Sequence, residues 1–211
     1  MYFFLVSFMI LGAGIKYVDA AYDEKTFSKK FALVAAPLLG ILWAYTMIVN
    51  NVAATILLAV VLAVVIKGKI DNLAHLSGVL VIVPVIFLAG IQLMWIPLVF
   101  LAAAALIDEI GNDYVDKKKN IFNDKNKFLG FVKYFFDHRW MMKVAILSLV
   151  LIGSVPVYFF FAMLLFDYAY LGVRIASDIK QGETESLILP KIWDIKQVTK
   201  AKKLSDEYSV A

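Results

Sequence analysis

The sequence has no cysteine and only two histidines in 211 residues. Without thiols the chain can form no disulfide framework, no thiolate zinc site and no cysteine nucleophile. His75 and His138 are also too few for a zinc site built on histidines. Charged residues make up 18% of the chain and hydrophobic residues 62%, with a mean hydropathy of +0.80. Such a composition excludes an ordinary soluble surface and indicates a polytopic membrane protein.

Long hydrophobic segments fill most of the chain. About 20 apolar residues are needed for a helix to cross a hydrocarbon core roughly 30 Å thick. Three tight, uncharged breaks are expected at Asn50-Asn51, between Trp95 and Pro97, and between Gly153 and Pro156. The sequence therefore predicts an all-α, polytopic transmembrane helix bundle of about seven spans, at residues 2–20, 31–49, 52–70, 78–94, 96–116, 141–154 and 156–177.

The other connections carry the lysines, which sets the expected orientation. Because lysine-rich loops stay on the cytoplasmic side, we expect the N-terminus outside and the C-terminus inside the cell. Residues 1–178 would form the bundle, with a cytoplasmic loop at 117–140 and a cytoplasmic tail at 179–211. The net charge of +4 is spread over membrane-flanking loops, so it indicates contact with membrane lipids and no nucleic acid. The expected location is a multi-pass position in the cell membrane of a prokaryote.

The segment from Lys117 to Arg139 contains an aromatic stripe. Its members share one helical face, with most of the nearby charges off that face: Phe128, Phe131, Val132, Phe135 and Phe136. Two interpretations fit this pattern. The helix lies in the plane of the lipid headgroups, or it packs on the bundle as a cytoplasmic loop helix.

Four aspartates recur at the inner ends of the hydrophobic segments. They are Asp19, Asp71, Asp108 and Asp167, and the first three are each followed four residues later by a polar residue on the same helical face. Counting from the outer breaks at 1.5 Å per residue places Asp108 and Asp167 about 20 Å deep, within the hydrocarbon. An ionised carboxylate there is costly unless it is paired, hydrated or metal-bound. If these side chains converge, they line a polar cavity open to the cytoplasm.

Local neutralisation is the alternative explanation. Lys16 precedes Asp19 by three residues and Lys67 precedes Asp71 by four, while Arg174 follows Asp167 by seven. Ion pairs along single helices would then account for the charges without a shared site.

Carboxylates without thiols or clustered histidines suit a hard cation. Mg²⁺ in particular is usually held by a few carboxylates together with water and substrate phosphates. A diphosphate headgroup is a natural partner for such a metal, with phosphate contacts from Lys16, Lys67 and Arg174 at the same level. The apolar groove would hold a lipid tail.

Two short motifs resemble those of UbiA-type intramembrane prenyltransferases. Asn112-Asp113-Tyr114-Val115-Asp116 resembles their NDxxD signature, and Asp19-Ala20-Ala21-Tyr22-Asp23 resembles their second motif, DxxxD. In that family the motifs bind a polyprenyl diphosphate through Mg²⁺, and the prenyl group is joined to an aromatic or lipid acceptor. The resemblance implies a metal set of Asp19, Asp23, Asp113 and Asp116, with Asn112 on the diphosphate.

Three functions are open at this point. The first is a Mg²⁺-dependent transferase acting on a prenyl or lipid diphosphate, in which Asp108 or Asp167 positions groups or transfers a proton. The second is a cation or proton-coupled transporter or channel that uses buried Asp108 and Asp167 as ion sites. The third is a non-catalytic membrane subunit or assembly factor, whose charges pair with a partner subunit. Small residues such as Gly12 and Gly14 permit close helix packing, within one chain or in a homo-oligomer.

Overall fold

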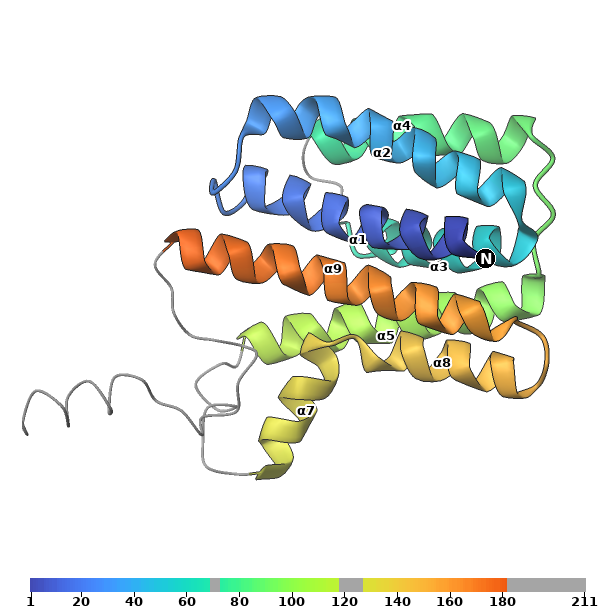
Figure 1. Cartoon of the computed structure of the whole chain (residues 1–211). Coiled ribbons are helices and arrows are strands. Elements are labelled where there is room, and N and C mark those ends of the chain that lie inside the picture. Colours follow the sequence, from blue (N-terminus) through green and yellow to red (C-terminus); the bar gives the residue numbers. More distant parts are fainter. Residues whose placement is uncertain (69–72, 118–126, 182–211) are drawn as a thin grey trace, which may run out of the picture.

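The computed structural model describes residues 1–68, 73–117 and 127–181, except for the side chains of residues 116, 127 and 137. These residues form eight helices (Figure 1). In chain order they are α1 (Tyr2–Tyr22), α2 (Lys29–Val49), α3 (Asn51–Ile66), α4 (Leu73–Leu88), α5 (Trp95–Lys117), α7 (Lys127–Asp137), α8 (Trp140–Leu151) and α9 (Val157–Gln181).

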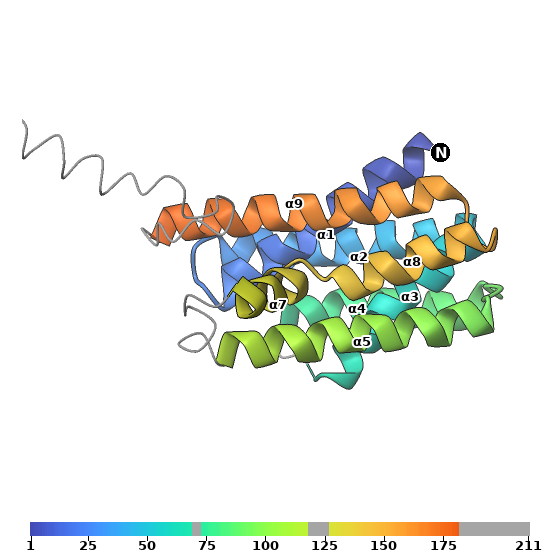
Figure 2. The ribbon, with the colours of Figure 1, turned by 90° about the horizontal axis from the view of Figure 1, so that it is seen from below.

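Six of the helices form a closed ring. Going round it, α1 packs on α9, α9 on α8, α8 on α5, α5 on α3, α3 on α2, and α2 returns to α1. α4 lies alongside α2 at the edge of this ring, and among the described residues α2 is its one extensive neighbour. α7 crosses the end of the bundle steeply and packs on α5 and α8, while the other helices run roughly parallel to one another (Figures 1 and 2).

The described part of the chain is all-α, as the sequence predicted. α1, α2, α5 and α9 are each long and apolar enough to cross a membrane, whereas α3, α4 and α8 are shorter apolar helices of 10–17 residues. Two expected boundaries were wrong. The break expected at Trp95–Pro97 lies earlier, because Gly90 takes a left-handed conformation with φ 59° and Pro97 is accommodated in the first turn of α5. α3 ends at Ile66 because Gly68, with φ 67°, turns the chain out of the helix.

The two other tight breaks are confirmed, and each has a capping device. The side-chain oxygen of Asn50 accepts hydrogen bonds from the backbone N–H groups of Val52 and Ala53, at 2.9 and 3.1 Å, and so starts α3. At the end of α8, Gly153 has φ 80° and its N–H donates to the carbonyl of Val150. This left-handed glycine stops the helix and lets the chain turn back into α9.

α1 and α9 approach each other most closely at Gly12. A methyl group at this position would lie 2.0 Å from the carbonyl oxygen of Phe166, so only glycine allows this contact. Phe4 packs on Phe159 along the same seam, with ring centroids 5.1 Å apart. Between helices in lipid the hydrophobic effect contributes little, so close packing over small residues is a main source of association.

α7 packs on α5 and α8 with one face and is exposed on the other. The ring of Phe136 lies directly over Gly111 of α5, which supports the interpretation that this helix packs on the bundle. Phe128, Phe131 and Tyr134 remain exposed on the other face. Because α7 runs across the bundle axis, this exposed face is compatible with the headgroup plane, which stays a prediction (Figure 1).

We predict that Gly12→Ala destabilises the folded protein by about 1–3 kcal/mol, because the new methyl group pushes α1 away from α9. The matched control is Gly172→Ala, in the interior of α9, where an added Cβ meets no atom within 4 Å. The control should be neutral, or more stable by about 0.5–1 kcal/mol. Thermal unfolding of both variants in detergent micelles measures the difference, and equal stabilities would contradict the packing described for this seam.

Candidate functional site

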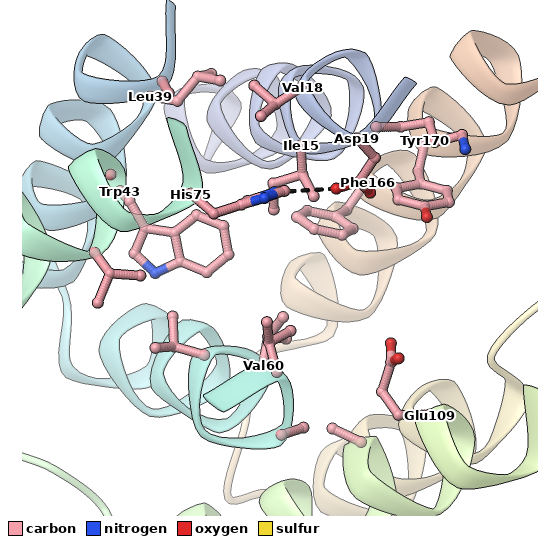
Figure 3. A pocket seen from close by; sticks show the side chains of 18 of the residues that line it. Ile15, Val18, Asp19, Leu39, Trp43, Val60, His75, Glu109, Phe166 and Tyr170 are labelled. Carbon is pink, nitrogen blue, oxygen red and sulfur yellow. Dashed lines mark ion pairs between the residues drawn. The ribbon is translucent and has the colours of Figure 1, made fainter. Parts of the chain in front are cut away.

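A cavity of ≈ 420 Å³ lies inside the helix ring, near the end at which α1 and α5 finish. Residues from α1, α2, α3, α4, α5, α8 and α9 line it. The volume falls within the range of roughly 300–1,000 Å³ that is common for small-molecule sites. Figure 3 shows α1 on one side of this space, α3 on the opposite side and Glu109 of α5 directed toward it.

The cavity has an apolar wall and a charged wall. Trp43, Val60 and Ile82 belong to the apolar wall, together with other aliphatic side chains of α2, α3 and α4. The charged wall has five carboxylates and two permanent cations, which are Asp19, Asp23, Glu24, Asp108, Glu109, Lys16 and Arg139, together with His75. Asp19 of α1 and Asp108 of α5 thus line one cavity, whereas Asp167, which was expected beside Asp108, does not line it.

Asp19 of α1 faces His75 of α4 across the cavity. The Asp19 Oδ1 atom lies 3.0 Å from His75 Nε2 (Figure 3). The sequence predicted His75 as the polar residue four places after Asp71 but not its contact with Asp19, because a contact between α1 and α4 depends on how the helices pack. One signal was available, since His75 takes the i+4 place after Asp71 that Asp23 takes after Asp19.

Glu24 joins the end of α1 to the end of α9. Its carboxylate pairs with Lys16 and accepts a hydrogen bond from the hydroxyl of Ser177, and its backbone carbonyl accepts one from the Gln181 side chain at 3.2 Å. Thr26 also bonds to Ser177. Glu24 was not among the predicted site residues, because it lies beyond the last apolar residue of the segment. Lys16 is thereby paired with Glu24 and not with Asp19, the partner expected for local neutralisation.

Asp108 holds α8 in place. Its two carboxylate oxygens accept hydrogen bonds from the backbone N–H groups of Met141 and Met142, at 3.0 and 2.7 Å. These N–H groups belong to the first turn of α8, where no partner within the helix is available. Arg139, which precedes α8, has φ 48°, and its own side chain makes no capping bond. A carboxylate of α5 thus caps a neighbouring helix, and this gives Asp108 a structural task.

Asp167 is paired within the bundle. Its Oδ2 atom lies 2.7 Å from Nζ of Lys143, and both side chains are almost fully buried. No lysine or arginine lies within one turn of Asp167 in its own helix, and the counter-charge comes from α8 instead. Lys143 lies inside a segment that is otherwise apolar, and this position was the available signal. Lys143 also donates to the carbonyl of His138, so the pair links α9 to the start of α8.

Two further ion pairs complete the charged end. Arg139 lies 3.1 Å from Glu109 and covers the ring of Tyr170 at 4.5 Å from its centroid. Lys67 at the end of α3 lies 2.7 Å from Asp113 of α5. The described ion pairs therefore connect separate helices or a helix and a loop, so single-helix neutralisation does not explain them.

The remaining predicted site residues lie apart from the cavity or outside the described part. Asn112 is partly buried, does not line the cavity, and its side-chain oxygen has no hydrogen-bond donor among the described residues. The cavity lining also lacks four other predicted site residues, Lys67, Asp113, Asp167 and Arg174. Asp71 lies outside the described residues, and of Asp116 only the backbone position in α5 is described.

Within residues 1–68, 73–117 and 127–181, no group of three or more acidic or histidine side chains is arranged to hold a metal ion. Asp19 lies instead against the ring nitrogen of His75, Asp113 against Lys67, and Asp108 against the backbone N–H groups of α8. These residues do not fit a ready-made Mg²⁺ site formed by protein ligands alone. A Mg²⁺ ion bound to phosphates needs only one or two carboxylates, so the cavity is compatible with a metal that enters with its substrate.

The apolar wall contains one unsatisfied donor. Trp43 is 4% exposed, and its indole N–H has no acceptor among the described residues. Buried polar groups without partners are rare in folded proteins, so each one is a candidate contact for a molecule bound nearby.

Comparisons of the sequence with family models and with curated proteins, and of the fold with solved structures, found no match. The function must therefore be argued from the site.

We predict that Asp167→Leu alone destabilises the protein by about 3–5 kcal/mol, because it leaves the buried ammonium of Lys143 without a counter-charge. The double variant Lys143→Met/Asp167→Leu should recover most of this loss, since neither charge then remains. Thermal unfolding in detergent micelles compares the two. A double variant as unstable as the single one would show that the pair has a role beyond mutual neutralisation.

Proposed function

We propose that this chain is an integral membrane enzyme, a transferase that acts on a prenyl or lipid diphosphate at the charged end of its cavity. The observation that supports it most is the division of one cavity into an apolar wall and a charged wall. An amphipathic lipid has the same division. Its chain would lie along α2, α3 and α4, and its headgroup would lie among the side chains at the ends of α1 and α5.

The proposal includes a topology of seven spans. α3, α4 and α8 are short for a full crossing, but they pack with four longer helices, and shorter spans are tolerated within a bundle. The tight turns before α3, α5 and α9 lie at one end of the bundle, and the charged cavity at the other (Figure 1). By the distribution of lysines, the cavity end faces the cytoplasm of a prokaryotic cell.

The charge of the cavity favours a substrate that brings cations. Five lining carboxylates stand against two permanent cations, so a free diphosphate would be repelled. A diphosphate bound to Mg²⁺ would be accommodated, because the ion neutralises part of the substrate and draws on one or two carboxylates. When bound, Mg²⁺ would stabilise the negative charge on the leaving diphosphate.

We assign roles to the aspartates of α1 and α5 from their positions at the charged end of the bundle. Asp19 and Asp23 at the end of α1 lie across the cavity from Glu109, and Asp113 and Asp116 follow one to two turns later in α5. This agrees with the two motifs that resemble those of UbiA-type prenyltransferases, and we propose these aspartates as the acidic set for the metal diphosphate. Lys16 and Arg139 line the cavity and Lys67 pairs with Asp113, and we propose these three cations as the contacts of the phosphate oxygens.

Asp108 and Asp167 receive less support as groups that transfer protons. One caps α8 and the other neutralises Lys143, so both are engaged in holding the helix ring together. We propose that they position the charged wall.

A cation or proton-coupled transporter is the second candidate. It is favoured by the buried Lys143–Asp167 pair, since ion pairs inside a membrane bundle often belong to proton pathways. A route across the membrane also needs polar groups at the opposite end. There, Asn50 is used to cap α3 and the hydroxyl of Thr55 bonds to backbone groups at Asn51 and Met94. Loss of ion flux in liposomes on Asp167→Asn would favour the transporter.

We predict that Asp23→Asn lowers turnover by about 10²-fold or more, because a negative charge facing the substrate's cations is lost. The measurement is the release of diphosphate from geranylgeranyl diphosphate in proteoliposomes containing Mg²⁺ and membrane lipids as acceptors. Asp113→Asn should have a similar effect, as should chelation of Mg²⁺.

The matched control for these substitutions is Asp178→Asn, near the C-terminal end of α9, because Asp178 belongs neither to the cavity lining nor to the proposed acidic set. It should leave turnover within about twofold of the unmodified protein. Turnover is compared at equal concentrations of folded protein, and thermal unfolding shows that each variant is folded. Unchanged turnover in folded Asp23→Asn and Asp113→Asn would contradict the proposed role of the acidic set.

A further inference from the structure

α3 and α4 are consecutive in the chain but do not pack together. Among the described residues α4 packs extensively on α2 alone, and α3 packs on α2 and α5. Both helices nevertheless line the cavity, α3 through Val60, Val61 and Val64, and α4 through Val79 and Ile82. The cavity wall between these two helices therefore consists of facing aliphatic side chains without a tight helix seam.

On other sides of the cavity, ion pairs and hydrogen bonds join neighbouring helices. Lys16 and Glu24 with Ser177 join α1 to α9, Lys143 and Asp167 join α8 to α9, and Asp108 joins α5 to α8. Along α4 only Ala74 and Ile82 are buried, and α4 meets α1 at the charged end, where His75 pairs with Asp19 and Ala74 belongs to a small buried cluster with Val18 and Ala21. The side of the bundle between α3 and α4 is thus the most weakly closed side toward lipid.

The volume of the cavity requires an opening if the substrate is a lipid. A space of ≈ 420 Å³ lies near the lower limit of small-molecule sites and holds a headgroup with only the first part of a chain. The rest of the chain must leave the cavity sideways, because hydrocarbon is unfavourable in water at the charged end.

We propose that the gap between α3 and α4 is a lateral entrance through which the hydrocarbon chain of a phosphate-bearing lipid passes from the membrane into the cavity. This inference rests on the proposed function for the class of lipid. The chain lies between the valines of α3 and α4 and reaches Trp43 of α2, and the headgroup lies at the charged wall.

Trp43 is a natural reporter of this path. It lies on the cavity wall, across from Val60, and it is shielded from the surrounding lipid, being 4% exposed (Figure 3). Trp95 at the start of α5 is 70% exposed and serves as the reference for bulk lipid. Two single-tryptophan proteins are made, each with the other three tryptophans replaced by phenylalanine.

The probe is a vesicle of phosphatidylcholine, in buffer containing Mg²⁺, with a minor fraction of phosphatidic acid brominated on its acyl chains, since bromine quenches tryptophan on contact. The entrance predicts a fractional fluorescence loss of Trp43 at least about twofold larger than that of Trp95, because the cavity enriches the phosphate-bearing lipid above its bulk fraction. Equal or weaker quenching of Trp43 would overturn the proposal.

Substitutions at the entrance test the route. Val64→Phe and Val79→Phe narrow the gap and should reduce the quenching of Trp43 to the level of Trp95 or below. Val65→Phe and Leu80→Phe are the matched controls, because these neighbours are 45% and 63% exposed and do not line the cavity. Quenching that persists in both entrance variants would exclude this route.

The two proposals fail separately. Strong quenching of Trp43 without turnover of geranylgeranyl diphosphate would overturn the transferase and leave the entrance standing. Turnover with Trp43 unquenched would leave the transferase standing and overturn the entrance.

Discussion

Charged side chains in a hydrophobic bundle must find partners, and this constraint organises the structure. Single helices do not supply these partners. Asp167 takes Lys143 from α8, Asp19 takes His75 from α4, and Asp108 accepts the free N–H groups of α8. Because each group would be costly alone at this depth, the pairs tie the helices into one arrangement. They also gather polarity at one end of an apolar cavity, and that polarity is the basis of the proposed chemistry.

The helical fold could be predicted because hydrophobic length is a local property of the sequence. The segments of α1, α2 and α9 follow directly from it, and Asn50 and Gly153 mark breaks by their own capping chemistry. The boundary between α4 and α5 was misplaced because Pro97 was taken as a break, although proline is accepted in a first helical turn. The closed order of six helices around a cavity could not be predicted, since it depends on packing between distant segments.

For the site, the sequence predicted where carboxylates gather but not what they contact. The recurring aspartates at the segment ends correctly indicated a common polar cavity, in which Asp19 and Asp108 are found. His75, Glu24 and Arg139 were missed because each is defined by a partner on another element. The size of the cavity and the lack of a packed seam between α3 and α4 are likewise tertiary features. The inference of a lateral entrance depends on them.

The one-sided attachment of α4 has a mechanical consequence. α4 meets α2 at Gly40 and Gly78, where the two backbones lie so close that a methyl group on Gly40 would come 2.7 Å from the Gly78 carbonyl oxygen. Among the described residues α4 packs extensively on no other helix, whereas ion pairs join α5, α8 and α9 on the other side of the cavity. Changes in bilayer thickness or lateral pressure would therefore be absorbed first by displacement of α4, which makes the width of the cavity sensitive to the composition of the surrounding membrane.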